Sequence, residues 1–61
     1  MWWKVYIEHN CERFYISRAY WVHSFGYTIY EFANKDGDIV EIEVLVNESL
    51  EDKVDVYVEE D

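Results

Sequence analysis

The sequence predicts a small, mainly β domain: an antiparallel meander or barrel of five to six short strands, with one short helix as an option. Three observations lead to this fold class. Apolar and polar residues alternate with a period of two in several runs, turn-forming residues separate the runs, and no proline interrupts them. Because the chain has 61 residues and is 51% hydrophobic, we expect one domain over residues 1–61.

The first thirty residues supply the first predicted strands. From Trp3 to His9 every second residue is apolar, which predicts a half-buried strand, and Asn10 lies in a turn. A second strand is expected from Arg13 to Arg18, with Phe14 and Ile16 facing inward.

Residues 19–25 fit two local structures. Tyr20 and Val22 alternate as in a short strand, which is the favoured interpretation. Ser17 is also a suitable cap for a short helix that would end before Gly26, so a helix is the alternative.

The second half of the chain predicts a hairpin. Residues 27–33 form a β-rich run, and Asn34-Lys35-Asp36-Gly37 reads as a turn in which Gly37 supplies a positive φ. In the strand that follows, one set of side chains is apolar and the other is mostly acidic. The first set is Val40, Ile42, Val44 and Val46, and the second is Glu41, Glu43 and Leu45.

The C-terminal residues predict a connection and a last strand. Residues 47–53 are polar, with room for one helical turn around residues 48–52. Apolar and polar residues then alternate again. The apolar set is Val54, Val56 and Val58, and the polar set is Asp55, Tyr57 and Glu59.

Charge and aromatic residues are divided unequally between the two halves. Residues 1–30 hold three basic and two acidic residues, whereas residues 31–61 hold two basic and twelve acidic ones, so the halves carry net charges of +1 and −10. Ten of the twelve aromatic residues lie in the first half. We expect Trp3, Phe14, Trp21 and Phe25 to fill much of the core. Adjacent aromatics such as Trp2 and Trp3 point to opposite faces of a strand, so some must remain exposed as interface anchors.

Catalytic and metal chemistry find little support in the sequence. His9, Cys11 and His23 are fewer ligands than a structural zinc site uses, and the spacing of residues 34–38 does not match a calcium loop. The carboxylates follow exposed strand faces rather than a shielded site that would raise one pKa. We therefore expect no enzyme activity, no cofactor and no metal.

The single cysteine and the hydropathy pattern indicate where the protein resides. Cys11 has no partner for an internal disulfide, which suits a reducing cytoplasm. The first residues lack the pattern of a signal peptide, and no apolar run is long enough to span a bilayer, so no membrane partner is expected.

Fixed rows of acidic side chains suggest a binding surface. Residues two apart on a strand lie about 6.6 Å from each other on one face, so Glu41 with Glu43, and Asp55 with Glu59, would form rows of negative charge. A DNA strand also presents a regular negative row, with phosphates rising about 3.4 Å along the axis. A rigid acidic sheet is therefore suited to a basic groove that evolved for DNA.

Three features of the chain are typical of a known class of small proteins. They are the turn Asn34-Lys35-Asp36-Gly37-Asp38, the following run Ile39-Val40-Glu41-Ile42-Glu43 and the acidic second half. The chain resembles, as a class, the small acidic inhibitors encoded by phages and mobile elements, including DNA-mimic antirestriction proteins and some anti-CRISPR proteins. The resemblance implies an inhibitor in the host cytoplasm that binds a nucleic-acid enzyme and blocks its DNA site.

The leading hypothesis is thus a non-enzymatic inhibitor whose acidic faces dock on a basic nucleic-acid-binding protein, with no direct binding of nucleic acid. The candidate partner-binding residues are Asp36, Asp38, Glu41, Glu43, Asp55, Tyr57 and Glu59. The alternative is a structural or assembly module that forms a homodimer or larger homo-oligomer through exposed Trp and Tyr side chains, among them Trp2 and Trp21.

Overall fold

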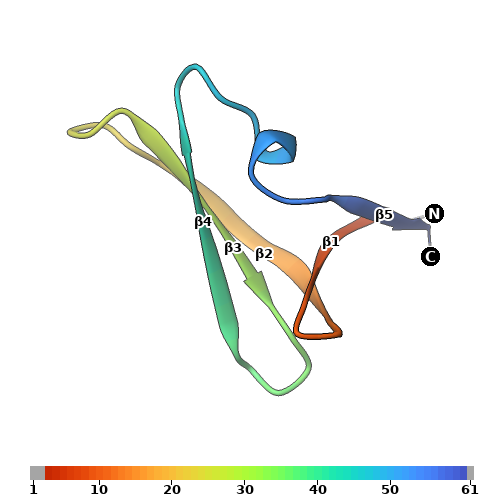
Figure 1. The fold of residues 1–61 in the computed structure, drawn as a ribbon. Coiled ribbons are helices and arrows are strands. Elements are labelled where there is room, and N and C mark those ends of the chain that lie inside the picture. The colour runs from red at the N-terminus through yellow and green to blue at the C-terminus, as the bar shows by residue number, and fades with distance from the viewer. Residues whose placement is uncertain (1–2, 61) are drawn as a thin grey trace.

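Five antiparallel strands form one open sheet in the order β4-β3-β2-β1-β5 in the computed structural model, which describes residues 3–60 (Figure 1). The strands are β1 (Trp3–His9), β2 (Glu12–Val22), β3 (Tyr27–Ala33), β4 (Ile39–Leu45) and β5 (Tyr57–Glu60). The prediction of a mainly β, antiparallel domain is confirmed, and within the described residues the sheet is open rather than a closed barrel. Trp2 lies outside the described residues.

The long strand β2 joins two segments that the sequence pattern separated. The predicted strand at residues 13–18 continues through residues 19–22, so the helical alternative is not adopted. The pairing register with β3 shifts between Ile16 and Arg18, which marks a β-bulge. The bulge reverses the apolar and polar alternation locally, and this reversal made one strand look like two in the sequence.

The bulge also divides the sheet. β1 pairs with β2 only from Glu12 to Tyr15, whereas β3 pairs with β2 from Tyr15 to Val22. Figure 1 shows the consequence, with β1 and β5 diverging from the group formed by β2, β3 and β4. Because a bulge increases the local twist and bends a strand, one strand can serve both parts of the sheet.

Tight turns connect the strands. Asn10 and Cys11, with φ of 54° and 63°, link the paired residues His9 and Glu12, as in a two-residue hairpin of the type in which both central residues have positive φ. The turn predicted around Gly37 is present, with a φ of 86° at this glycine. Positive φ is easily adopted by glycine but costs energy at Cys11.

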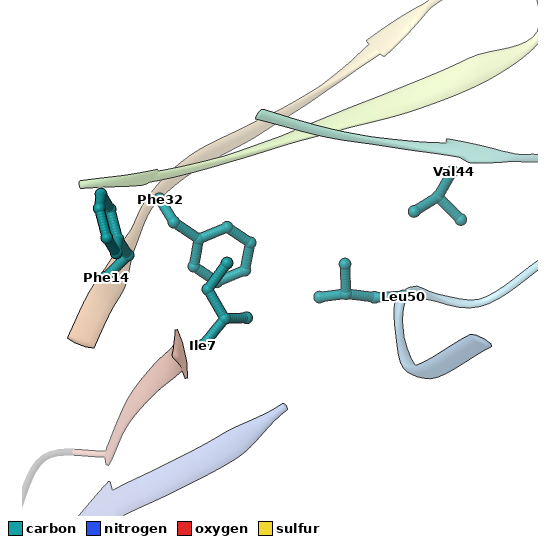
Figure 2. Packing of buried hydrophobic residues seen from close by; sticks show 5 residues of the cluster. All are labelled: Ile7, Phe14, Phe32, Val44 and Leu50. Atoms are coloured by element: carbon teal, nitrogen blue, oxygen red, sulfur yellow. The ribbon is translucent and has the colours of Figure 1, made fainter. Parts of the chain in front are cut away.

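The core lies on one face of the sheet and consists of Ile7, Phe14, Phe32, Val44 and Leu50. Figure 2 shows these side chains between β2, β3 and β4 on one side and β1 with the C-terminal segment on the other. Phe32 is fully buried at its centre. Leu50 belongs to the 3-10 turn η1 (Leu50–Asp52), which confirms the single helical turn expected in the connection.

Three of the four aromatics expected in the core are exposed. Phe14 is buried, but Trp3, Trp21 and Phe25 are 64%, 45% and 72% exposed. The prediction for these three was wrong: Trp3 begins β1, Trp21 lies next to the end of β2 and Phe25 lies in the β2–β3 turn, and none of them belongs to the buried cluster. Ile16 points to the core side as expected, because it pairs with Phe32, and it is 37% exposed.

The last part of the chain is less regular than its sequence pattern. β5 begins at Tyr57, so Val54 and Asp55 precede the strand instead of forming it. Val54 and Val56 are partly buried against the core, whereas Val58 is 56% exposed. Val46 lies beyond the end of β4 and is 79% exposed, so its predicted inward position was wrong.

Candidate protein-binding surface

The face of the sheet opposite the core, called the outer face below, carries most of the charged strand residues. Its position follows from the register. Glu31 pairs with Glu41, and this pair lies between Phe32–Val40 and Tyr30–Ile42, whose side chains pack in or against the core. Because adjacent residues of a strand point to opposite faces, Glu31, Glu41 and Glu43 point outward.

The hairpin of β3 and β4, residues 27–45, is rich in carboxylates and is called the acidic hairpin below. It contains five carboxylates (Glu31, Asp36, Asp38, Glu41 and Glu43) and one lysine, for a net charge of −4. Glu41 and Glu43 are exposed, and their side chains make no hydrogen bond or ion pair with the described residues. Their carboxylates are therefore free for a partner.

Glu31 extends this row onto the neighbouring strand. It lies directly opposite Glu41, where cross-strand Cβ atoms are about 4.5 to 5.5 Å apart and like charges are destabilising. Arg18 on β2 offsets part of this repulsion, because its Nε lies 3.4 Å from Oε2 of Glu31. The outer face thus carries a row of Arg18, Glu31 and Glu41 across β2, β3 and β4, with Glu43 beside it.

The turn of the acidic hairpin is organised by a buried amide. The Asn34 side chain is 8% exposed, and its Oδ1 accepts hydrogen bonds from the backbone N–H groups of Asp36 and Asp38 at 3.0 and 2.8 Å. Its Nδ2 donates to Oδ2 of Asp38 at 3.3 Å. Asn34 therefore fixes the backbone that presents Asp36 and Asp38, both of them exposed, at one end of the acidic hairpin.

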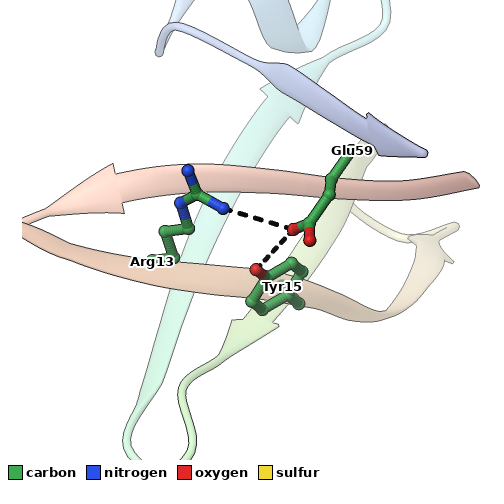
Figure 3. Close-up of polar contacts among 3 residues, drawn as sticks. All are labelled: Arg13, Tyr15 and Glu59. Atoms are coloured by element: carbon green, nitrogen blue, oxygen red, sulfur yellow. Dashed lines mark hydrogen bonds and ion pairs between the residues drawn. The ribbon is translucent and has the colours of Figure 1, made fainter. Parts of the chain in front are cut away.

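On the other side of the sheet, Glu59 is engaged within the protein. Its Oε1 accepts a hydrogen bond from the Tyr15 hydroxyl at 2.6 Å and another from Nη1 of Arg13 at 3.3 Å (Figure 3). These contacts connect β5 to β2 across β1. They also neutralise Glu59, so this carboxylate contributes little to a negative surface.

Tyr57 belongs to the same network. It stacks on Tyr6 with a centroid distance of 5.4 Å, and Tyr6 contacts Tyr15 at 5.4 Å, which defines a tyrosine cluster of Tyr6, Tyr15 and Tyr57. The guanidinium of Arg13 lies 4.5 Å from the Tyr6 ring centroid. The pKa of Arg13 is raised above its ordinary value, chiefly by a side-chain hydrogen bond with Tyr15 and then by Tyr6.

The structure therefore separates the seven candidate residues into two groups. Asp36, Asp38, Glu41 and Glu43 lie together on the acidic hairpin. Tyr57 and Glu59 lie on the opposite edge strand, since β3, β2 and β1 separate β4 from β5. Asp55 is exposed but precedes β5, so the expected strand row of Asp55 and Glu59 is not formed.

Sequence reasoning missed two members of the charged row, Glu31 and Arg18. The signal for Glu31 was present, because counting outward from the turn at residues 34–38 pairs Ala33 with Ile39 and hence Glu31 with Glu41. Arg18 was hidden by the bulge, which moves it to the outer face beside Glu31.

A group of exposed apolar side chains lies at the end of the sheet near the β2–β3 turn, with members on both faces. It consists of Tyr20, Trp21, Phe25, Leu45 and Val46. Phe25 stacks on Tyr27 at a centroid distance of 6.0 Å, and Trp21 meets His23 edge-on at 6.3 Å. Exposed aromatic and aliphatic side chains of this kind are common anchors of protein interfaces.

The described residues enclose no pocket and contain no cluster of three or more metal-binding side chains. No helix in this part of the chain has the length and apolar character needed to cross a membrane. Comparison with known proteins found no matching family model, curated protein or solved structure. Functional inference therefore depends on the surface of the sheet.

Proposed function

We propose that this protein is a non-enzymatic inhibitor that binds a basic nucleic-acid-binding protein through its acidic hairpin and competes there with nucleic acid. The cytoplasm is the proposed compartment. The acidic hairpin replaces the wider surface expected from the sequence. Tyr57 and Glu59 are not part of the proposed contact, because they hold the β1–β5 region together.

The observation that supports this proposal is that the carboxylates of Glu41 and Glu43 are free of contacts within residues 3–60, whereas that of Glu59 is bound within the protein. Glu41 and Glu43 are exposed on a regular strand and pair with none of the residues that the structure describes, although five basic residues are present in the chain. Glu31 lies opposite Glu41 at some cost in repulsion. A row of free carboxylates on a rigid sheet costs little conformational entropy when it binds, because the backbone that carries it is already ordered.

Electrostatic attraction gives the proposal a kinetic signature. A chain with a net charge of −9 should associate rapidly with a basic surface, and the association rate should fall as ionic strength rises. The acidic hairpin would present its carboxylates about 6.6 Å apart along β4, to side chains that otherwise contact phosphates.

The experiment is a double charge reversal, E41K/E43K, compared with a matched control, E51K/E60K. Glu51 and Glu60 are exposed residues outside the acidic hairpin, so both variants have the same net charge. Immobilised parent protein is used to capture partners from a lysate of the source organism, and duplex DNA is then added at constant ionic strength.

The expected result is that DNA releases the captured partner, that E41K/E43K captures at least tenfold less of it, and that E51K/E60K captures nearly the parental amount. Circular dichroism should show that both variants fold. Equal losses in the two variants would show that net charge alone controls binding, and a fully active E41K/E43K variant would refute the proposed surface.

A further inference from the structure

The second half of β2 is exposed in an unusual way for a strand in the middle of a sheet. All six residues from Ile16 to Trp21 are exposed, on both faces of the sheet. β3 pairs with one side of this segment, but the register between β1 and β2 ends at Tyr6–Tyr15. Within the described residues, the backbone of residues 16–22 therefore has a free edge on the side away from β3.

This free edge differs chemically from the outer edges of β4 and β5. The outer edge of β4 carries Glu41 and Glu43, and that of β5 carries Glu59 and Glu60. Charged side chains on an edge strand discourage the addition of another strand. Residues 16–22 contain no carboxylate, and Arg18 is their single charged residue. The β2 edge is thus an edge at which another strand of this acidic protein can approach without meeting carboxylates.

Large side chains flank the β2 edge on both faces. Trp21, which pairs in register with Thr28, lies on the core side and is 45% exposed. Tyr20 lies on the outer face and is 39% exposed, and Ile16 on the core side is 37% exposed. An added strand would cover apolar surface on both faces and also satisfy the free backbone groups.

We propose that the β2 edge pairs with the β2 edge of a second copy of this chain, antiparallel and centred on Ala19. The two copies then form a six-stranded sheet from β2, β3 and β4 of each. Ala19 is exposed and small, so it allows two identical strands to approach at the two-fold axis. This proposal is independent of the proposed inhibitor function, because Glu41 and Glu43 stay accessible.

The sequence around Ala19 is complementary to itself in this register. Arg18 of one copy lies opposite Tyr20 of the other, and the reverse pair forms on the other side of the axis. Within a single chain the Arg18 guanidinium already lies 4.9 Å from the Tyr20 ring centroid, so the cation–π pairing is suited to these side chains. The acidic β4 strands become the two outermost strands, which keeps the acidic hairpins of the two copies far apart.

A disulfide trap tests the register directly. In a Cys11→Ser background, which removes the exposed native thiol, Ala19→Cys places two thiols across the proposed axis. Opposed residues of an antiparallel pair have Cα atoms about 4.5 to 5.5 Å apart, a separation that a disulfide can bridge. The matched control is Ile39→Cys in the same background, because Ile39 is 51% exposed on β4 and outside the proposed interface.

Under mild oxidation, most of the Ala19→Cys protein should become covalent dimer. The yield of covalent dimer from the Ile39→Cys protein should be at least tenfold lower. Similar yields from both variants, or no cross-link from Ala19→Cys, would overturn the proposed register. If Ala19→Cys does not fold, the parent protein supplies the deciding measurement, which is hydrogen exchange as a function of concentration.

In the parent protein, amide protection of residues 17–21 should rise with concentration in parallel with dimer content measured by sedimentation. A protein that stays monomeric up to millimolar concentration would overturn the proposal. A dimer that is dissociated by Val46→Lys but not by Ala19→Lys would also overturn the proposal. Val46 lies at the apolar end of the sheet, so this result would place the dimer interface there.

Discussion

The two edge strands of this sheet carry glutamates in opposite situations. On β4, Glu41 and Glu43 face solvent and have no partner among residues 3–60, and Glu41 lies opposite another glutamate. On β5, Glu59 accepts hydrogen bonds from Tyr15 and Arg13. Residues that look alike in the sequence therefore differ in their surroundings, and among Glu41, Glu43 and Glu59 only Glu59 is held by contacts within the part of the chain that the structure describes.

The reason for the difference is the distribution of basic and hydroxyl groups on the neighbouring strands. β1 and β2 bring Arg13 and Tyr15 within reach of β5 on the outer face. β3 offers β4 mainly Ile29 and Glu31 at the matching positions. The side chains on the neighbouring strands thus determine whether the carboxylates of an acidic edge strand are paired or free.

The largest expected effect on stability comes from detaching the segment that connects β4 to β5. Leu50 is the single buried residue among residues 46–60, and it attaches the segment between β4 and β5 to the core. Leu50→Ala should lower the free energy of unfolding by about 2 to 5 kcal/mol, a large share of the stability of so small a domain.

Leu45→Ala is the control for this substitution, because Leu45 is the same residue type but is 44% exposed at the end of β4. It should cost less than about 1 kcal/mol. Urea unfolding monitored by tryptophan fluorescence measures both. Equal losses would mean that the C-terminal segment does not depend on Leu50 for its attachment.

An intermediate effect is expected from removing the charge of individual glutamates. Glu59→Gln should lower the free energy of unfolding by about 0.5 to 1.5 kcal/mol, since it weakens two hydrogen bonds at a partly exposed site. Glu41→Gln should change it by no more than about 0.5 kcal/mol, and in the stabilising direction, because it removes a like charge opposite Glu31.

A double-mutant cycle between Tyr15→Phe and Glu59→Gln sharpens this comparison. The two changes should be non-additive, because Tyr15→Phe removes the 2.6 Å hydrogen bond that Glu59→Gln weakens. Chemical denaturation of the four proteins measures the coupling. Additive effects, or a loss at Glu41 as large as that at Glu59, would contradict the different roles assigned to the two edges.

The smallest expected effect concerns two turns that connect neighbouring strands. The turn before β4 has glycine at its positive-φ residue, whereas the β1–β2 turn has Cys11 with a φ of 63°. Cys11→Gly should raise the free energy of unfolding by roughly 0.5 to 1 kcal/mol, because glycine adopts this conformation without a Cβ clash.

Gly37→Ala is the mirror experiment and should be destabilising by a similar amount, because a residue with a Cβ would be strained at a φ of 86°. Thermal unfolding of both variants is the measurement. A Cys11→Gly protein less stable than the parent would show that the Cys11 side chain stabilises the turn by contacts that outweigh its backbone strain.

Most of the strands could be predicted from local patterns. The bounds of β1 and β3, the turn at Gly37 and the helical turn at Leu50 follow from periodicity and turn residues that lie close together in the chain. The positions of Trp3, Trp21 and Phe25 could not be predicted this way. Their burial depends on how far the C-terminal segment extends over the sheet, and hydrophobicity alone does not determine that.

The sequence by itself determined the β architecture, the division of charge between the halves and the outward direction of Glu41 and Glu43, because side-chain alternation is a local property of an extended backbone. Only the tertiary structure decided that Glu59 is engaged, that Glu31 and Arg18 join the outer row, and that residues 16–22 keep a free edge. These features depend on register and on a bulge, which bring together residues such as Tyr15 and Glu59, separated by 44 positions in the chain.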